Sequence, residues 1–158
     1  MTALFTIGYE RATPPALLAA LRAAGVRRVV DVRALANSRR PGFAKRALSA
    51  ALEEAGIGYL HLRALGTPPE GREAVRAGRP EVMRRIFARH LAGVKAQAAL
   101  AALADEARCN GPICLLCLEA DPRNCHRSLV AEALAEGGGA AITHLHAGAH
   151  DADLPRPP

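Results

Sequence analysis

The sequence predicts an α/β fold, built as a single three-layer domain in which helices cover both faces of a mainly parallel, five-stranded sheet. Two observations predict this class. Short apolar or β-branched segments alternate along the chain with longer segments of helical periodicity, which is the order that parallel strands require. The 158 residues match the usual size of one domain with one hydrophobic core. The domain is expected to span residues 1–146, and the Pro-rich tail over 147–158 is expected to be flexible.

The first part of the chain holds three of the expected strands and two of the helices. The strands are expected at 3–7, 27–33 and 57–62. Thr13 followed by two prolines is typical of a helix start, and Gly25 is typical of a helix end. A second helix is expected over 44–55, with Gly56 as its stop.

Residues 63–79 are expected to form a long loop, because Gly and Pro residues repeatedly interrupt the pattern. These interruptions are Gly66, Pro68, Pro69 and Gly71. A loop of that length in a compact domain suggests a functional or mobile segment. Helical periodicity resumes near Glu81 and again over 94–107.

The last part of the chain is expected to contribute two strands and one helix. Residues 113–118, ICLLCL, form the most apolar strand of the sequence. Asp121 as a cap and Pro122 as the first helical residue are expected to start a helix directly after it, and this helix runs through Glu136. Residues 141–146 are the fifth expected strand.

The composition excludes several classes of protein. Half of the residues are hydrophobic and 23% are charged, which excludes a wholly disordered chain. No apolar run approaches the roughly 18 residues that a membrane span needs. The segment 1–10 lacks the features of a secretory signal, so a cytoplasmic protein without a membrane partner is expected.

The net charge of +6 favours anionic partners, and a phosphate-bearing small molecule or a nucleic acid is the expected partner. Arg supplies 19 of the 21 basic residues, a bias that a GC-rich genome explains equally well. Aromatic residues make up 3% of the chain, which argues against a protein that stacks single-stranded bases on aromatic side chains. No cofactor is indicated.

Polar residues gather where the expected strands end, and the carboxyl ends of parallel strands share one edge of a sheet. We therefore expect one site at that edge, which would bind an anion such as phosphate through planar guanidinium groups. The expected anion- or substrate-binding residues are Tyr9, Asp31, Arg33, Arg39, Arg40, His61 and Arg127. The pair Arg39 and Arg40 is equally explained as a solvated turn. At least one of Asp31 and Arg33 is expected to pair with a residue of 117–127.

The segment 117–127, CLEADPRNCHR, carries the densest group of reactive side chains. Cys125 is expected in the first turn of the helix, where the helix dipole and nearby Arg127 favour its thiolate. Glu119 is placed to act as an acid, a base or a hydrogen-bond acceptor. Cys117 is interpreted as a small core residue. The expected catalytic residues are Cys125, Glu119 and His126.

Two further patterns involve cysteine. Cys114-x-x-Cys117 and Cys125-His126 offer soft metal ligands. Residues three apart on a strand point to opposite faces, so Cys114 and Cys117 cannot easily share an ion, and no metal ligand is assigned. The stretch 29–33 and a C-x5-R pattern that starts at Cys117 are similar to rhodanese-type and cysteine-phosphatase sequences. Two acidic residues and a proline inside that C-x5-R loop argue against an anion cradle there.

A resemblance to a known family rests on five segments. They are TIGYE at 6–10, VVDVR at 29–33, SRRPGF at 38–43, YLHLRALG at 59–66 and CLEADPRNCHR at 117–127. Together they resemble the domain of unknown function 488 family, which implies a compact α/β domain with these segments around one cleft and implies no established reaction. Family members often have a His-Ser-Asn type of sequence after the first strand. This chain has Tyr9, Glu10 and Arg11 there, so no role is carried over to them.

Three function classes follow from these observations, and the sequence leaves them open. The first is an enzyme that acts on a phosphate-bearing substrate, either a nucleotide or a nucleic acid. The second is a non-catalytic module that binds phosphate or nucleic acid with the same basic residues. The third is a rhodanese-like or metal-binding cysteine protein.

Overall fold

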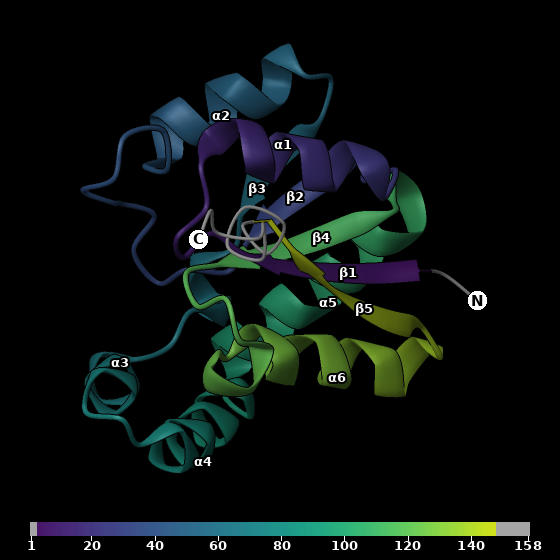
Figure 1. Cartoon of the computed structure of the whole chain (residues 1–158). Coiled ribbons are helices and arrows are strands. Elements are labelled where there is room, and N and C mark those ends of the chain that lie inside the picture. Colours follow the sequence, from purple (N-terminus) through teal and green to yellow (C-terminus); the bar gives the residue numbers. More distant parts are fainter. Residues whose placement is uncertain (1–2, 148–158) are drawn as a thin grey trace.

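The computed structural model describes residues 3–147, which form an α/β domain around a five-stranded sheet (Figure 1). All five strands run parallel, in the order β3-β2-β4-β1-β5. The strands are β1 (Ala3–Gly8), β2 (Arg28–Asp31), β3 (Gly58–His61), β4 (Ile113–Cys117) and β5 (Ala141–His146). The predicted fold class is confirmed. The expected tail over 147–158 lies outside the described residues, apart from Ala147.

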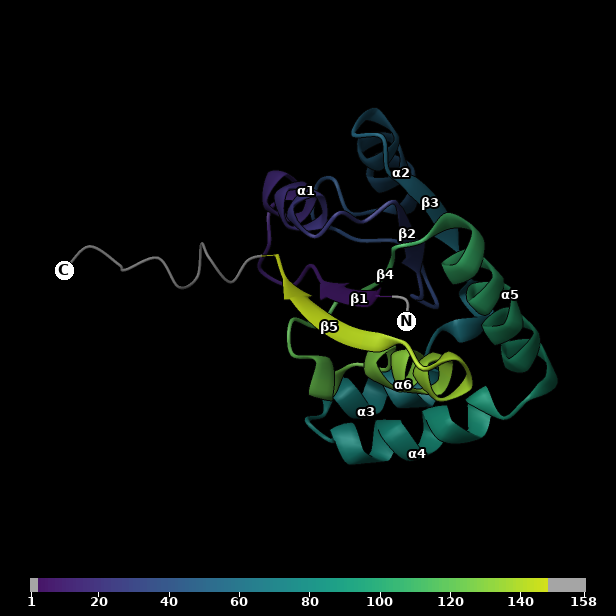
Figure 2. The same ribbon diagram turned by 90° about the vertical axis from the view of Figure 1, so that its right-hand side faces the viewer.

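Helices lie on both sides of the sheet, as Figures 1 and 2 show. Helices α1 (Pro14–Ala23) and α2 (Lys45–Glu54) lie on one side. The opposite side holds α3 (Pro69–Arg76), α4 (Pro80–Leu91), α5 (Val94–Asn110) and α6 (Arg127–Gly138). Each side has its own buried apolar cluster, so the sheet is the middle of three layers. None of the helices within residues 3–147 combines the length and apolarity that crossing a lipid bilayer requires.

The first two helices begin and end for the local reasons that their sequences suggest. The Thr13 hydroxyl accepts the N–H of Ala16 at 3.2 Å and caps α1, whose first two residues are prolines. Gly25 follows α1 and Gly56 follows α2, both with positive φ, a conformation that glycine adopts without steric cost. Neighbouring residues alone therefore determine the start of α1 and the ends of both helices.

The structure corrects the prediction of a long loop over 63–79. This stretch contains a 3-10 turn, η1 (Arg63–Leu65), and then the two-turn helix α3 (Pro69–Arg76). Proline is well tolerated in the first turn of a helix, where its missing N–H would have no intrahelical partner. Helix α3 packs against α4, and buried Ala74 belongs to the apolar cluster on that side of the sheet. The prolines therefore mark the start of a helix rather than a continuous loop.

The helix expected to start at Asp121 is interrupted, which is a second correction. The Asp121 carboxylate does act as a cap, since it accepts the N–H of Arg123 at 2.9 Å. The turn that follows is a 3-10 turn, η2 (Pro122–Asn124), and the chain is extended again at Cys125. Helix α6 begins only at Arg127. The N–H groups of η2 are bonded to backbone carbonyls or to the Asp121 carboxylate, so they are not available to an anion.

The strand β4 separates its two cysteines, as the alternation of side chains along a strand predicts. Cys114 packs in the apolar cluster beneath α1 and α2, whereas Cys117 packs in the cluster on the α3–α6 side. The chain leaves neighbouring strands β1 and β4 toward opposite sides of the sheet, into α1 and α6 respectively. Such a reversal opens a crevice at the carboxyl ends of the strands.

Candidate functional site

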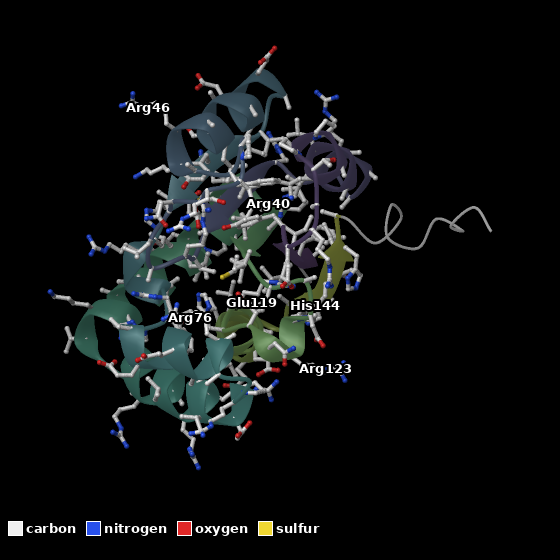
Figure 3. The ribbon with its side chains drawn as sticks, turned by 60° about the vertical axis from the view of Figure 1, so that its left-hand side comes forward. Arg40, Arg46, Arg76, Glu119, Arg123 and His144 are labelled. Atoms are coloured by element: carbon white, nitrogen blue, oxygen red, sulfur yellow. The ribbon has the colours of Figure 1, made fainter. Side chains whose placement is uncertain are left out.

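A cavity of about 290 Å³ lies at the carboxyl ends of β1, β2 and β4, where that crevice is expected. Its floor includes Cys117, Glu119 and His126, and its wall includes Arg72 and Arg76 of α3. Figure 3 shows Glu119 and Arg76 at this edge of the molecule. We call it the strand-end cavity.

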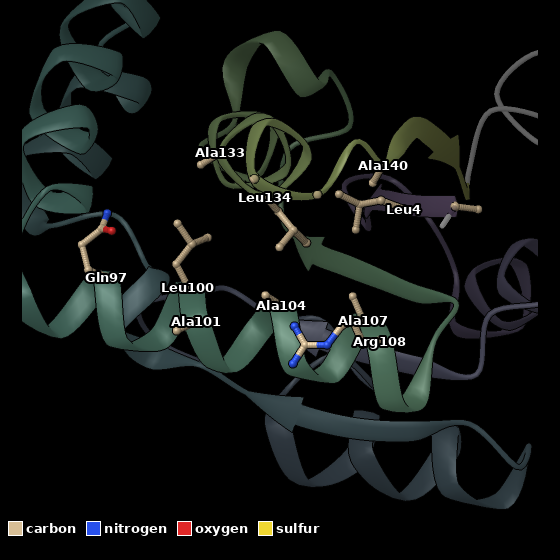
Figure 4. Close-up of a pocket in the computed structure, with 13 residues that line it drawn as sticks. Leu4, Gln97, Leu100, Ala101, Ala104, Ala107, Arg108, Ala133, Leu134 and Ala140 are labelled. Carbon is tan, nitrogen blue, oxygen red and sulfur yellow. The ribbon is translucent and has the colours of Figure 1, made fainter. Parts of the chain in front are cut away.

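A larger cavity of about 560 Å³ lies at the opposite end of the sheet, between α5 and α6 (Figure 4). Alanine, leucine and glycine dominate its lining, with Leu100 and Leu134 reaching into it. Arg108 is the one charged side chain among the described residues that line it, and it pairs with Asp105. This cavity therefore lacks the converging polar groups of a candidate reactive site.

Two thiols and one imidazole meet at the floor of the strand-end cavity. The Sγ atom of Cys117 lies 3.7 Å from Nδ1 of His126, and the Sγ atom of Cys125 lies 3.9 Å from the same nitrogen. All three ligand-capable atoms lie within 4.8 Å of one another, and all three residues are buried. We call this group the thiol–imidazole cluster.

The orientation of the His126 ring is fixed by the protein. Its Nε2 lies 2.7 Å from the carbonyl oxygen of Val32, just beyond the end of β2, and the ring packs edge-on against Phe87. A carbonyl oxygen can only accept a hydrogen bond, so Nε2 carries the proton. In the neutral ring, Nδ1 then presents its lone pair to the two thiols.

The two thiols have different acidities. Burial opposes ionisation of Cys125, but a hydrogen bond from Cys117 and the positive charge of Arg127 act in the other direction, and the pKa of this thiol lies well below its usual value. The hydrogen bond to Cys125 and burial raise the pKa of Cys117. Cys125 is therefore the more readily ionised of the two thiols.

Glu119 adds a carboxyl group beside the cluster. Burial, followed by the neighbouring Cys125, raises the pKa of Glu119 to about 8. This carboxyl group is therefore largely protonated at neutral pH. It can donate a hydrogen bond, as an acid would in catalysis.

The loop over 118–121, which carries Glu119, is held from both sides. The backbone N–H of Glu10 donates to the carbonyl of Leu118 at 2.8 Å, and the Glu10 carboxylate accepts the N–H of Ala120 at 3.0 Å. From below, Arg127 donates to the carbonyl oxygens of Glu119 and Ala120. The loop is therefore a rigid support for the side chains beside it.

Close packing of β1 against the same loop requires a glycine. A Cβ atom at Gly8 would lie 1.8 Å from the carbonyl oxygen of Glu119, far inside van der Waals contact. Any side chain at this position would push the loop away from β1. Gly8, at the end of the TIGYE segment, thus sets the position of Glu119.

Arg127, one of the expected anion-binding residues, does not line the strand-end cavity. Its side chain is completely buried, and its Nε donates to the Thr6 hydroxyl at 3.1 Å while its two Nη groups bind the carbonyls of Glu119 and Ala120. Arg127 therefore joins β1 to the 118–121 loop from inside the protein. It also supplies positive charge next to Cys125.

Asp31 and Arg33 form a buried ion pair with each other, not with residues 117–127, which corrects that prediction. The Arg33 Nη2 lies 2.7 Å from the Asp31 carboxylate, and Asp31 also accepts the Tyr59 hydroxyl at 2.6 Å. The Nη1 of Arg33 donates to the Tyr9 hydroxyl and to the carbonyl of Phe43. Arg33 and Tyr9 do line the strand-end cavity, but the Arg33 guanidinium is already engaged on all three nitrogens.

Three further residues of the expected anion site point elsewhere. Arg40 donates to the carbonyls of Tyr9 and Ala12 and stacks over the Phe43 ring, so it fastens its loop to the protein. Arg39 is exposed and outside the cavity lining, and His61 lies 2.7 Å from the carbonyl of Arg33 through its Nε2. None of these three side chains lines the strand-end cavity within the described residues.

The structure brings the expected catalytic residues together, but Cys125 lies at a different place relative to α6 than predicted. Cys125, Glu119 and His126 are neighbours, but Cys125 precedes the cap of α6 instead of lying in a helical first turn. Sequence reasoning did not include Cys117 in the site, because this residue ends an apolar strand and was interpreted as part of the core. The C-x7-C-H spacing was the available signal. It also missed Arg72 and Arg76, whose spacing of four becomes visible only once α3 is assigned as a helix.

Comparison with known proteins gives one result. A family model described as "Domain of unknown function DUF488" matches residues 14–134, most of the chain and all of the elements from α1 to α6 except the end of α6. Searches of the curated proteins and of the solved structures found no match.

Proposed function

Because the chain belongs to the family described as Domain of unknown function DUF488, whose description names no activity, we propose a function from the geometry of the strand-end cavity. The cavity binds a phosphate-bearing small molecule. Arg72 and Arg76 contact the phosphate, and the thiol–imidazole cluster with Glu119 faces the rest of the ligand.

The observation that carries this proposal is the pair of arginines on α3. Residues four apart lie on the same side of a helix, so both guanidinium groups face the cavity. Arg72 is held by one hydrogen bond, from Nη1 to the carbonyl of Thr67 at 2.9 Å, which leaves most of its N–H donors free. Within residues 3–147, Arg76 forms no ion pair or side-chain hydrogen bond. Planar guanidinium groups with free N–H pairs suit phosphate oxygens.

The size of the cavity favours a small molecule over a polymer. Its volume of about 290 Å³ lies near the lower end of the range of ligand pockets, which is roughly 300–1,000 Å³. A nucleic-acid chain needs a groove that continues past the site on both sides. A nucleotide or a smaller phosphate ester is therefore the better fit among the partners that the sequence suggests.

Calorimetric titration with inorganic phosphate, AMP and ATP tests this proposal. Arg72→Ala and Arg76→Ala should each weaken binding by about ten- to a hundredfold, since a hydrogen bond to a charged group is worth about 1.5–3 kcal/mol. Arg46→Ala, which removes an exposed arginine of α2 far from the cavity, is the matched control and should bind as the unchanged protein does. Equal weakening in all three variants would contradict a defined site and would support diffuse binding of polyanions to the basic surface. Absence of binding by every probe would overturn the proposal.

A further inference from the structure

We infer that Cys117, Cys125 and His126 bind a zinc ion, with the fourth coordination position open to the strand-end cavity. This inference deepens the proposed function, because the ion would lie at the floor of the cavity that holds the phosphate-bearing molecule. It rests on four observations, which concern distance, orientation, the convergence of electron-pair donors, and access.

The sulfur–nitrogen distances within the thiol–imidazole cluster match a tetrahedral site. With Zn–S of about 2.3 Å and Zn–N of about 2.1 Å, tetrahedral angles place a sulfur and a nitrogen ligand about 3.6 Å apart. The two Sγ atoms lie 3.7 and 3.9 Å from Nδ1 of His126. A zinc ion would therefore fit between the three atoms with only small side-chain movements.

The imidazole has the support that metal-binding histidines have. A histidine ligand usually donates its second ring N–H to a carbonyl or carboxylate, which fixes the ring and directs the other nitrogen at the metal. The Val32 carbonyl has this role for Nε2 of His126, at 2.7 Å. The 118–121 loop between the two cysteines is held by Glu10 and Arg127, so the ligands are positioned before the ion arrives.

Three electron-pair donors converge at this place, which favours a cation between them. The two Sγ atoms and the unprotonated Nδ1 of His126 face one another in a buried position. One zinc ion can accept an electron pair from all three atoms. Two thiolates would cancel its double charge, which makes the buried site neutral, and the two thiol protons would leave to solvent. Cys114, an equally buried thiol on the other face of the sheet, has no such partners among the described residues; its Sγ lies 3.8 Å from the carbonyl of Leu115.

The ion would be accessible from one direction only. Cys117 and His126 line the strand-end cavity, whereas Cys125 lies behind them. Structural zinc sites are closed by four protein ligands, and catalytic sites keep three plus an open position for water or substrate. The cluster has three ligands and an open side, so it corresponds to the catalytic kind. Glu119 and the phosphate-binding arginines face that open side.

Cobalt substitution tests the site directly. The full-length protein, treated with chelator and reductant, is titrated with Co²⁺ alone, and the cobalt–thiolate absorption is recorded. We expect one ion per chain and loss of the absorption when Zn²⁺ is added. Cys117→Ser, Cys125→Ser and His126→Ala should each weaken metal binding by more than the roughly 10- to 100-fold that loss of a supporting outer group causes. Cys114→Ser and Cys109→Ser are the matched controls, one buried and one exposed, and should bind unchanged.

Two outcomes would overturn the inference. One is the absence of cobalt–thiolate absorption in the unchanged protein, and the other is equal loss of binding in the control variants. Circular dichroism confirms that each variant is folded, and the near-isosteric serine variants answer the question if His126→Ala does not fold. Arg72→Ala should keep the cobalt spectrum intact. The metal site and the phosphate site can therefore fail separately.

Discussion

At the scale of single residues, the structure shows how a buried charge is accommodated. Asp31 is completely buried, and its carboxylate is balanced by the Arg33 guanidinium at 2.7 Å and by the Tyr59 hydroxyl. Both ends of the ion pair are satisfied, since Arg33 also donates to Tyr9 and Phe43. The pair lies at the carboxyl end of β2, and Arg33 lines the strand-end cavity.

Removal of Arg33 should therefore destabilise the fold far more than removal of a neutral partner. Arg33→Met leaves the Asp31 carboxylate buried without its cation, which costs about 3–5 kcal/mol in the free energy of unfolding. Tyr59→Phe removes one hydrogen bond to the same carboxylate and should cost about 1.5–3 kcal/mol, the range for a bond to a charged group. Urea denaturation measures both. A cost for Arg33→Met no greater than that of Tyr59→Phe would show that the ion pair is not the main support of Asp31.

At the scale of elements, the edge strand β5 is tied to β1 by a polar contact as well as by its ladder. The Nδ1 of His144 lies 2.6 Å from the Thr6 hydroxyl, which also accepts the Nε–H of Arg127. The Thr6 hydroxyl proton is then free to be donated to His144, so the imidazole is an acceptor and neutral. Burial, followed by the nearby charges of Arg127 and His146, lowers the pKa of His144 below its usual 6.5.

This contact predicts a pH dependence of stability. Because the unfolded chain binds the His144 proton more readily, stability is full above about pH 6.5 and falls as the pH drops toward the lower pKa of the folded state. Glu132 and Cys125 act against the shift but do not reverse it. His144→Asn keeps an acceptor for Thr6 and removes the titration. Between about pH 7 and pH 5, the free energy of unfolding of this variant should fall by less than that of the unchanged protein.

Urea denaturation at the two pH values checks this prediction, with Thr143→Asn as the control on the same strand. Thr143 is exposed and does not titrate, so its replacement should leave the pH dependence nearly unchanged. If His144→Asn and the unchanged protein lose stability in parallel, the contact with Thr6 does not control the acid sensitivity.

At the scale of the whole molecule, two apolar clusters share one sheet. Leu21 of α1 is buried in the cluster on one side, and Leu103 of α5 is buried in the cluster on the other. If the sheet comes apart, the apolar residues of both clusters are exposed to water. The described domain should therefore unfold in a single transition.

Leucine truncations on the two sides test this coupling. Leu21→Ala and Leu103→Ala should each lower the free energy of unfolding by about 2–5 kcal/mol, the usual cost of a buried cavity. In both variants, far-ultraviolet circular dichroism and the reactivity of the buried Cys114 thiol should report the same midpoint in urea. Different midpoints for the two probes in either variant would show that the sides unfold separately.

The sequence by itself determined the fold class, the five strands, the cap of α1 and the gathering of Glu119, Cys125 and His126 at the strand ends. These features depend on short windows of sequence, in which side-chain periodicity and proline or glycine positions decide the local backbone. The helix α3 was missed because its local signals fit both a loop and a short helix. Packing against α4 decided between them.

Only the tertiary structure decided how each polar side chain is used. Arg127 is separated from its partner Thr6 by 121 positions, and His126 from the Val32 carbonyl by 94, so no local pattern could indicate these bonds. A buried polar group must find a partner, and the partner that it finds depends on which segments the sheet brings together. For that reason Arg127 points inward, Cys117 lies beside Cys125 and His126, and Arg72 and Arg76 of α3 line the strand-end cavity.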